Sequence, residues 1–111
     1  MDISFAKTKH QEIFNSEKEL VREYGRDNAR IIMRRMSVLR AAANLEEVSV
    51  LPPERRHELT GNRKEQFAID LKQPFRLLFK PNHESVPRKK DGGIDLRQIT
   101  AITLLGVEDY H

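Results

Sequence analysis

The fold is decided by residues 67–79, which read FAIDLKQPFRLLF. Apolar and other side chains alternate in each half of this stretch, and that period is typical of a β-strand with one buried face. The KQP segment between the halves, at residues 72–74, indicates a tight turn. Residues 67–79 therefore predict an antiparallel β-hairpin. Its alternating apolar positions are Phe67, Ile69 and Leu71 in one strand and Phe75, Leu77 and Phe79 in the other.

Residues 7–43, which precede this hairpin, have a helical pattern. Apolar side chains recur three or four residues apart, and Gly25 is suited to ending one helix while Asp27 is suited to starting the next. Ser16 and Glu19 have the spacing of a capping box, so a helix begins or restarts near Ser16. Two helices joined by little more than a glycine predict an antiparallel helical hairpin. The apolar positions include Ile13, Leu20, Val21, Tyr24, Ala29, Ile32, Met33, Met36, Leu39 and Ala43.

Strand patterns continue on both sides of the predicted β-hairpin. The proline pair at 52–53 excludes a helix there, and residues 56–81 have the pattern of strands. Residues 82–93 (NHESVPRKKDGG) have the composition of a loop. Residues 97–107 (RQITAITLLGV) form the last apolar, β-branched run, and residues 2–6 (DISFA) could form one further short strand.

Length and composition agree with one folded domain. The 111 residues include 38% apolar and 33% charged side chains, which is typical of a globular chain with a modest core. We therefore expect a single α+β domain over residues 1–111. In this fold an N-terminal helical hairpin packs on a small, mainly antiparallel sheet of about four strands.

Several classes of protein are excluded by composition. The chain has no cysteine for disulfides or thiolate metal sites, and no apolar run approaches the roughly 20 residues of a membrane span. Its first residues lack the pattern of a secretory signal, so we expect a cytoplasmic protein with no membrane partner. A net charge of +3 and a pI near 9.4 permit contact with an anionic polymer without requiring it.

Acid–base side chains occur at both ends of the predicted sheet. His57 lies where the sheet begins, whereas we expect His10 and His83 to be solvated. No short-spaced histidine pair is present, so we expect neither a metal nor another cofactor. The last predicted strand leads directly into Asp109, Tyr110 and His111.

These residue types suit RNA cleavage by internal attack. A 2′-hydroxyl must lose a proton, the phosphorane must be stabilised, and the leaving 5′-oxygen must gain a proton. Histidine serves either proton role near neutral pH, and an arginine such as Arg76 can bind the phosphate through two hydrogen bonds. Arg76 alternates with the apolar positions of its strand, although periodicity alone equally predicts a solvated arginine there.

Two segments carry a family resemblance, and they lie at residues 51–79 (LPPERRHELTGNRKEQFAIDLKQPFRLLF) and 99–111 (ITAITLLGVEDYH). Together with the arginine-rich helical region, they resemble the HigB branch of the RelE/ParE toxin superfamily over most of the chain. The resemblance implies a RelE-like fold and a plasmid-maintenance toxin that cuts translated mRNA in the ribosomal A site. It also implies a HigA-like helix-turn-helix antitoxin, through which alone the toxin would meet operator DNA.

The same resemblance implies which residues form the site. The HigB-type catalytic set falls on His57, Arg76, Asp109, Tyr110 and His111. The two histidines would share the base and acid roles in an order that the resemblance leaves open. This chain has Thr60 where the family usually has lysine, and that removes one positive charge near the implied site.

Basic side chains elsewhere are candidates for contact with RNA phosphates, a salt-sensitive interaction. Arg63 and Lys64 match basic family positions, and the helical region contributes Arg30 and Arg34 together with Arg26, Arg35 and Arg40. The predicted loop adds Arg88, Lys89 and Lys90. A solvated helix face explains the helical arginines equally well.

Two other functions fit the same fold. A ParE-like toxin would inhibit DNA gyrase and would not need His57 or the Asp-Tyr-His sequence. A non-catalytic module would bind only a partner or a nucleic acid, and the Thr60 departure is compatible with such a weakened nuclease.

Overall fold

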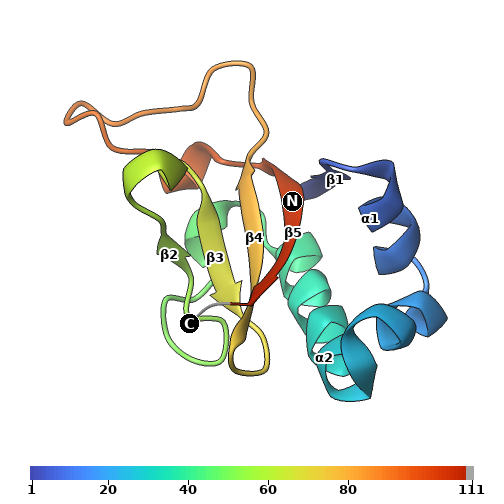
Figure 1. Ribbon diagram of the computed structural model, residues 1–111. Coiled ribbons are helices and arrows are strands. Elements are labelled where there is room, and N and C mark those ends of the chain that lie inside the picture. The colour runs from blue at the N-terminus through green and yellow to red at the C-terminus, as the bar shows by residue number, and fades with distance from the viewer. Residues whose placement is uncertain (110–111) are drawn as a thin grey trace.

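Five strands form one sheet in the order β1-β5-β4-β3-β2 in the computed structural model, which describes residues 1–109. Tyr110 and His111 lie outside the described residues. The helices cover one face of the sheet, and a long connection between β4 and β5 projects from one end (Figure 1). The strands are β1 (Asp2–Phe5), β2 (His57–Glu58), β3 (Phe67–Asp70), β4 (Phe75–Pro81) and β5 (Ala101–Asp109).

The predicted β-hairpin is confirmed as β3 and β4. The two strands are antiparallel, with Phe67 opposite Phe79 and Ile69 opposite Leu77. The rings of Phe67 and Phe79 stack with centroids 5.8 Å apart. These side chains face the helices and form the centre of the core, because the alternation of the strands puts them all on one face.

The prediction of about four mainly antiparallel strands is wrong in number, because the sheet has five. β5 pairs antiparallel with β4, but β1 pairs parallel with β5, from Asp2 opposite Ala101 to Phe5 opposite Leu104. β1 and β5 are almost the full length of the chain apart, and no local periodicity specifies such a pairing. β2 is the other edge strand and contains only two residues.

The helical region contains α1 (Thr8–Phe14) and α2 (Glu17–Ala41). The capping box is confirmed at its serine, since the Ser16 side chain accepts a hydrogen bond from the Glu19 backbone N–H at 3.2 Å. Gly25, with φ 84° and ψ 162°, interrupts α2 and divides it into two arms. A groove of about 560 Å³ has lining residues from both arms, as a helical hairpin requires. None of the helices within residues 1–109 is long and apolar enough to cross a membrane.

Arg35 joins the second arm of α2 to the sheet instead of facing solvent as a basic helix residue would. Its side chain is buried, and its Nε donates a hydrogen bond to the Asp70 carbonyl oxygen at 2.7 Å. Its Nη2 donates to the Pro53 carbonyl oxygen at 3.3 Å. The suggestion that Arg35 contacts RNA is therefore wrong, because its hydrogen-bond donors bind β3 and the segment before β2.

We predict that Gly25→Ala destabilises the protein by about 1–3 kcal/mol, because the backbone conformation at Gly25 is one that essentially only glycine adopts. A Cβ there meets nothing within 4 Å, so steric overlap makes no contribution. Urea unfolding at constant pH would measure the loss, with Ser37→Ala on the exposed side of α2 as the control. An unchanged midpoint for Gly25→Ala would show that the turn does not depend on glycine.

Candidate functional site

Charged side chains cross the sheet on its outer face, which we define as the face turned away from α2. Asp70 of β3 lies opposite Arg76 of β4, and Arg76 lies opposite Glu108 of β5. Arg76 is on this face because its neighbours Phe75 and Leu77 pack against the core. The outer face therefore carries a row of alternating acid, base and acid at the end of the sheet where β4 begins.

A β-bulge in β5 decides which residues join this row. Leu78 is opposite Gly106, but the next residue of β4, Phe79, is opposite Leu104, so Leu105 has no partner on β4. The extra residue reverses the alternation along β5. Simple alternation from Leu104 would turn Glu108 toward the core, whereas the bulge turns it toward Arg76.

Glu108 binds two arginines. The Nη1 of Arg63 lies 2.9 Å and 2.7 Å from the two carboxylate oxygens of Glu108, and the Nη2 of Arg76 lies 3.5 Å from one of them. Arg63 comes from the short 3₁₀ turn Gly61–Arg63 between β2 and β3. Arg63, Glu108 and Arg76 thus form a cluster, here called the arginine–glutamate cluster, with a net charge of +1.

His57 lies on the same face of the sheet. It is opposite Ala68 of β3, which is opposite Leu78 of β4, so His57 and Arg76 share the outer face. Two strand spacings and an offset of two residues put their Cα atoms about 12 Å apart. A phosphodiester and its flanking ribose can bridge this separation.

The His57 ring is oriented by its own segment. Its Nδ1 lies 2.9 Å from the Arg55 carbonyl oxygen. Because a carbonyl oxygen only accepts hydrogen bonds, Nδ1 is the donor and carries the proton of the neutral ring. Nε2 is then the nitrogen with a lone pair, which is the form that a general base requires.

The same bulge determines the face of the sheet to which alternation assigns Asp109. It is opposite Phe75 at the end of β5, and alternation assigns it to the face opposite that of Arg76 and Glu108. The structure therefore brings His57 and Arg76 to one face and leaves Asp109 at the edge of the other. Tyr110 and His111, the remaining predicted catalytic residues, lie outside the described residues.

Glu108 was missed as a site residue. The sequence shows it next to the Asp-Tyr-His residues, but its contact with Arg76 depends on the register of β4 with β5 and on the bulge. A pattern search finds neither, because both are relations between strands that are distant in sequence.

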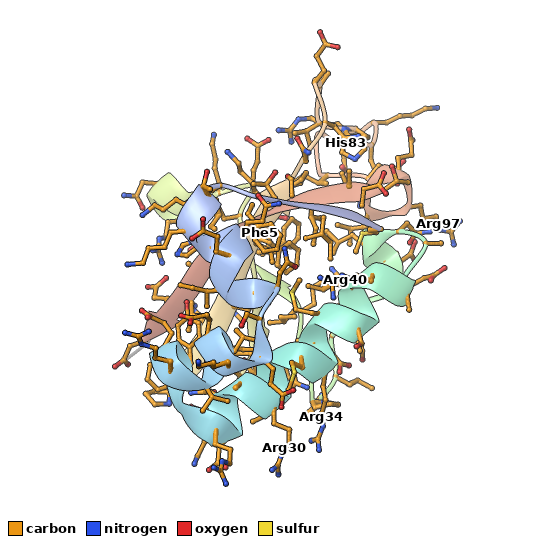
Figure 2. The ribbon with its side chains drawn as sticks, turned by 90° about the vertical axis from the view of Figure 1, so that its right-hand side faces the viewer. Phe5, Arg30, Arg34, Arg40, His83 and Arg97 are labelled. Carbon is orange, nitrogen blue, oxygen red and sulfur yellow. The ribbon has the colours of Figure 1, made fainter. Side chains whose placement is uncertain are left out.

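The predicted RNA-binding residues come from three parts of the chain: the second arm of α2, the segment between β2 and β3, and the connection between β4 and β5. Arg30 and Arg34 are exposed on the second arm of α2 and point outward from the hairpin (Figure 2). Lys64 and Lys90 are also exposed, whereas Arg88 pairs with Glu65, and Lys89 lies 3.9 Å from Asp91. Since α2 covers the other face of the sheet, Arg30 and Arg34 do not lie beside Arg76.

His10 supports the bulge, and the expectation that it is solvated is wrong. A Cβ at Gly106, whose φ is 138°, would lie only 3.0 Å from Cε1 of His10. The His10 ring also packs edge-on against Phe14, with centroids 6.4 Å apart. Burial, with a smaller effect of Lys7, lowers the pKa of His10. α1 is thus in direct contact with β5 two residues before Glu108.

Comparisons with known proteins do not assign the chain. A scan against protein-family models finds no match, and a search of curated proteins also finds none. Within residues 1–109, no group of three or more His, Cys, Asp or Glu side chains is placed to hold a metal ion. Function is therefore inferred from the residues of the outer face and the sequence resemblance.

We predict that His10 makes the protein less stable as the pH falls. The folded state lowers the pKa of His10 below its ordinary value of 6.5, so protonation favours the unfolded chain. The contribution of neutral His10 to the free energy of unfolding is fully present above pH 6.5. It is lost as the pH falls through the folded-state pKa. Urea unfolding would measure the fall in the free energy of unfolding between pH 7.5 and pH 5. His10→Phe keeps a ring against Gly106 and should show a smaller fall than wild type.

His83→Gln is the control, because it removes one imidazole from another part of the chain. Its free energy of unfolding should fall by as much as that of wild type. Equal losses in wild type and His10→Phe would contradict the assignment.

Proposed function

We propose that the chain is a HigB-type toxin of a type II toxin–antitoxin system, a ribosome-dependent mRNA endoribonuclease that inhibits translation. The observation that carries the proposal is the outer face of the sheet. There a histidine with Nε2 available as a base shares one surface with Arg76 and Arg63. The sequence resemblance at residues 51–79 and 99–111 supports the same conclusion.

The proposed reaction is internal attack on an mRNA phosphodiester, without a metal or another cofactor. His57 Nε2 accepts the proton of the 2′-hydroxyl, and the 2′-oxygen forms a bond to phosphorus. Arg76 stabilises the charge of the phosphorane. The bond from phosphorus to the 5′-oxygen then breaks, and an acid donates a proton to that oxygen. The products are a 2′,3′-cyclic phosphate and a 5′-hydroxyl.

The acid and its supporting groups are assigned through the resemblance. It implies His111 as the second proton-transfer residue, with Tyr110 positioning a base or the RNA backbone. Asp109 would orient or electrostatically tune an imidazole from the end of β5. In support of this role, Asp109 lies opposite Phe75, at the end of the sheet where Arg76 also lies.

The proposed partners are the ribosome, the mRNA in its A site and a HigA-like helix-turn-helix antitoxin. Exposed cations at Arg30, Arg34, Lys64 and Lys90 are available for ribosomal RNA phosphates. Arg88 and Lys89 would have to exchange their acidic neighbours for phosphates. Operator DNA would be contacted only through the antitoxin, and the toxin would act in the cytoplasm.

A specific observation favours a second candidate, a non-catalytic binding module. Glu108 holds both Arg63 and Arg76, and a paired arginine offers less positive charge to a phosphorane than a free one does. Together with Thr60 in place of a lysine, this arrangement is what a site adapted to binding a partner would show.

We predict that purified protein added to translating ribosomes cuts mRNA, and that His57→Ala lowers the cleavage rate by about 10²–10⁴-fold. Primer extension would map the new 5′ ends, with naked mRNA as a substrate control. His83→Ala is the matched variant, because it removes a histidine from the β4–β5 connection and should retain activity. Intact mRNA with the wild-type protein, or unchanged cleavage by His57→Ala, would contradict the proposal.

A further inference from the structure

We infer that the Glu108 carboxylate occupies the position of an RNA phosphodiester and competes with RNA for Arg63 and Arg76. The inference deepens the proposed function and rests on it for the identity of the anion. It assigns Glu108 a regulatory role: the carboxylate weakens RNA binding at the outer face unless further phosphate contacts strengthen it.

The geometry of the arginine–glutamate cluster is that of an anion site. Arg63 Nη1 contacts both carboxylate oxygens at 2.9 Å and 2.7 Å, and Arg76 approaches one of them from β4 at 3.5 Å. A carboxylate and a phosphodiester each carry one negative charge on two oxygens, and guanidinium groups bind both kinds of anion. A phosphodiester can therefore replace the carboxylate without moving either arginine far.

The burial of the three side chains shows which of them can move. The side chain of Arg76 is 10% exposed, whereas those of Glu108 and Arg63 are 28% and 40% exposed. The Arg76 side chain is thus nearly buried, whereas the Glu108 and Arg63 side chains are more accessible to solvent. Because ion pairs that reach solvent are weak, a phosphodiester arriving from solvent can displace Glu108 from Arg76.

The consequence concerns selectivity. With Glu108 in place, the cluster has a net charge of +1 and a low affinity for any single phosphodiester. Free RNA would bind poorly, and productive binding would need the further phosphate contacts that a ribosome supplies. Glu108 would thus contribute to ribosome dependence by weakening the contact with RNA alone.

The test is the affinity for a short single-stranded oligodeoxynucleotide, which has no 2′-hydroxyl and cannot undergo internal attack. Fluorescence anisotropy at low salt should show tighter binding for Glu108→Gln than for wild type, by roughly fivefold. Glu84→Gln makes the same change of net charge in the exposed β4–β5 connection and should alter the affinity by much less.

Far-UV circular dichroism would verify that Glu108→Gln is folded. If it is not, Glu108→Asp is the alternative, because it keeps the charge but shortens the side chain. Its affinity for the oligodeoxynucleotide should lie between that of wild type and that expected for Glu108→Gln. Unchanged or weaker binding by the folded variants, or an equal gain in Glu84→Gln, would overturn the inference.

The probe separates this inference from the nuclease proposal, since it reports binding whether or not the protein cuts mRNA. Tighter binding by Glu108→Gln together with intact mRNA in the ribosome assay would contradict the nuclease proposal and support the anion site. Ribosome-dependent cleavage with no gain in oligodeoxynucleotide affinity for Glu108→Gln would support the nuclease proposal and contradict the role inferred for Glu108.

Discussion

The bulge of β5 at Leu105 and Gly106 is the constraint on which the candidate site depends. Before the bulge, β5 turns Ile102 and Leu104 toward the core. After it, the alternation is reversed, so Val107 packs with the core and Glu108 meets Arg76 on the outer face. The bulge favours glycine at Gly106, because φ is 138° there and a Cβ would crowd the His10 ring, with Cε1 only 3.0 Å away. α1, β5 and the arginine–glutamate cluster are therefore coupled through one backbone irregularity.

Much of the fold could be predicted because its signals are local. The β3–β4 hairpin follows from strict alternation and a short turn, and the helical hairpin follows from Gly25 and the Ser16 cap. The parallel β1–β5 pairing and the two-residue β2 could not be predicted, because they depend on tertiary contacts instead of periodicity. The burial of Arg35 was hidden for the same reason, since its partners Asp70 and Pro53 are distant in sequence.

The site was predictable by residue type but not by position. His57 and Arg76 share the outer face, and the Nδ1 hydrogen bond of His57 leaves its Nε2 with a lone pair. The role expected for Asp109, orienting or tuning an imidazole, stays a prediction, whereas the contact of Glu108 with Arg76 follows from the bulge and was not predicted. Arg30 and Arg34 lie elsewhere, exposed on the second arm of α2.

The most direct test of this account is to locate the bound RNA. Amide chemical shifts of ¹⁵N-labelled protein, which also report weak binding, would be followed while a short RNA is added in large excess. Its 2′-hydroxyls are methylated, so it cannot be cleaved by internal attack. We expect shifts that cluster on β2, β4 and the end of β5, around His57, Arg76 and Glu108. Shifts confined to α2 near Arg30 and Arg34, with the outer face unchanged, would contradict it.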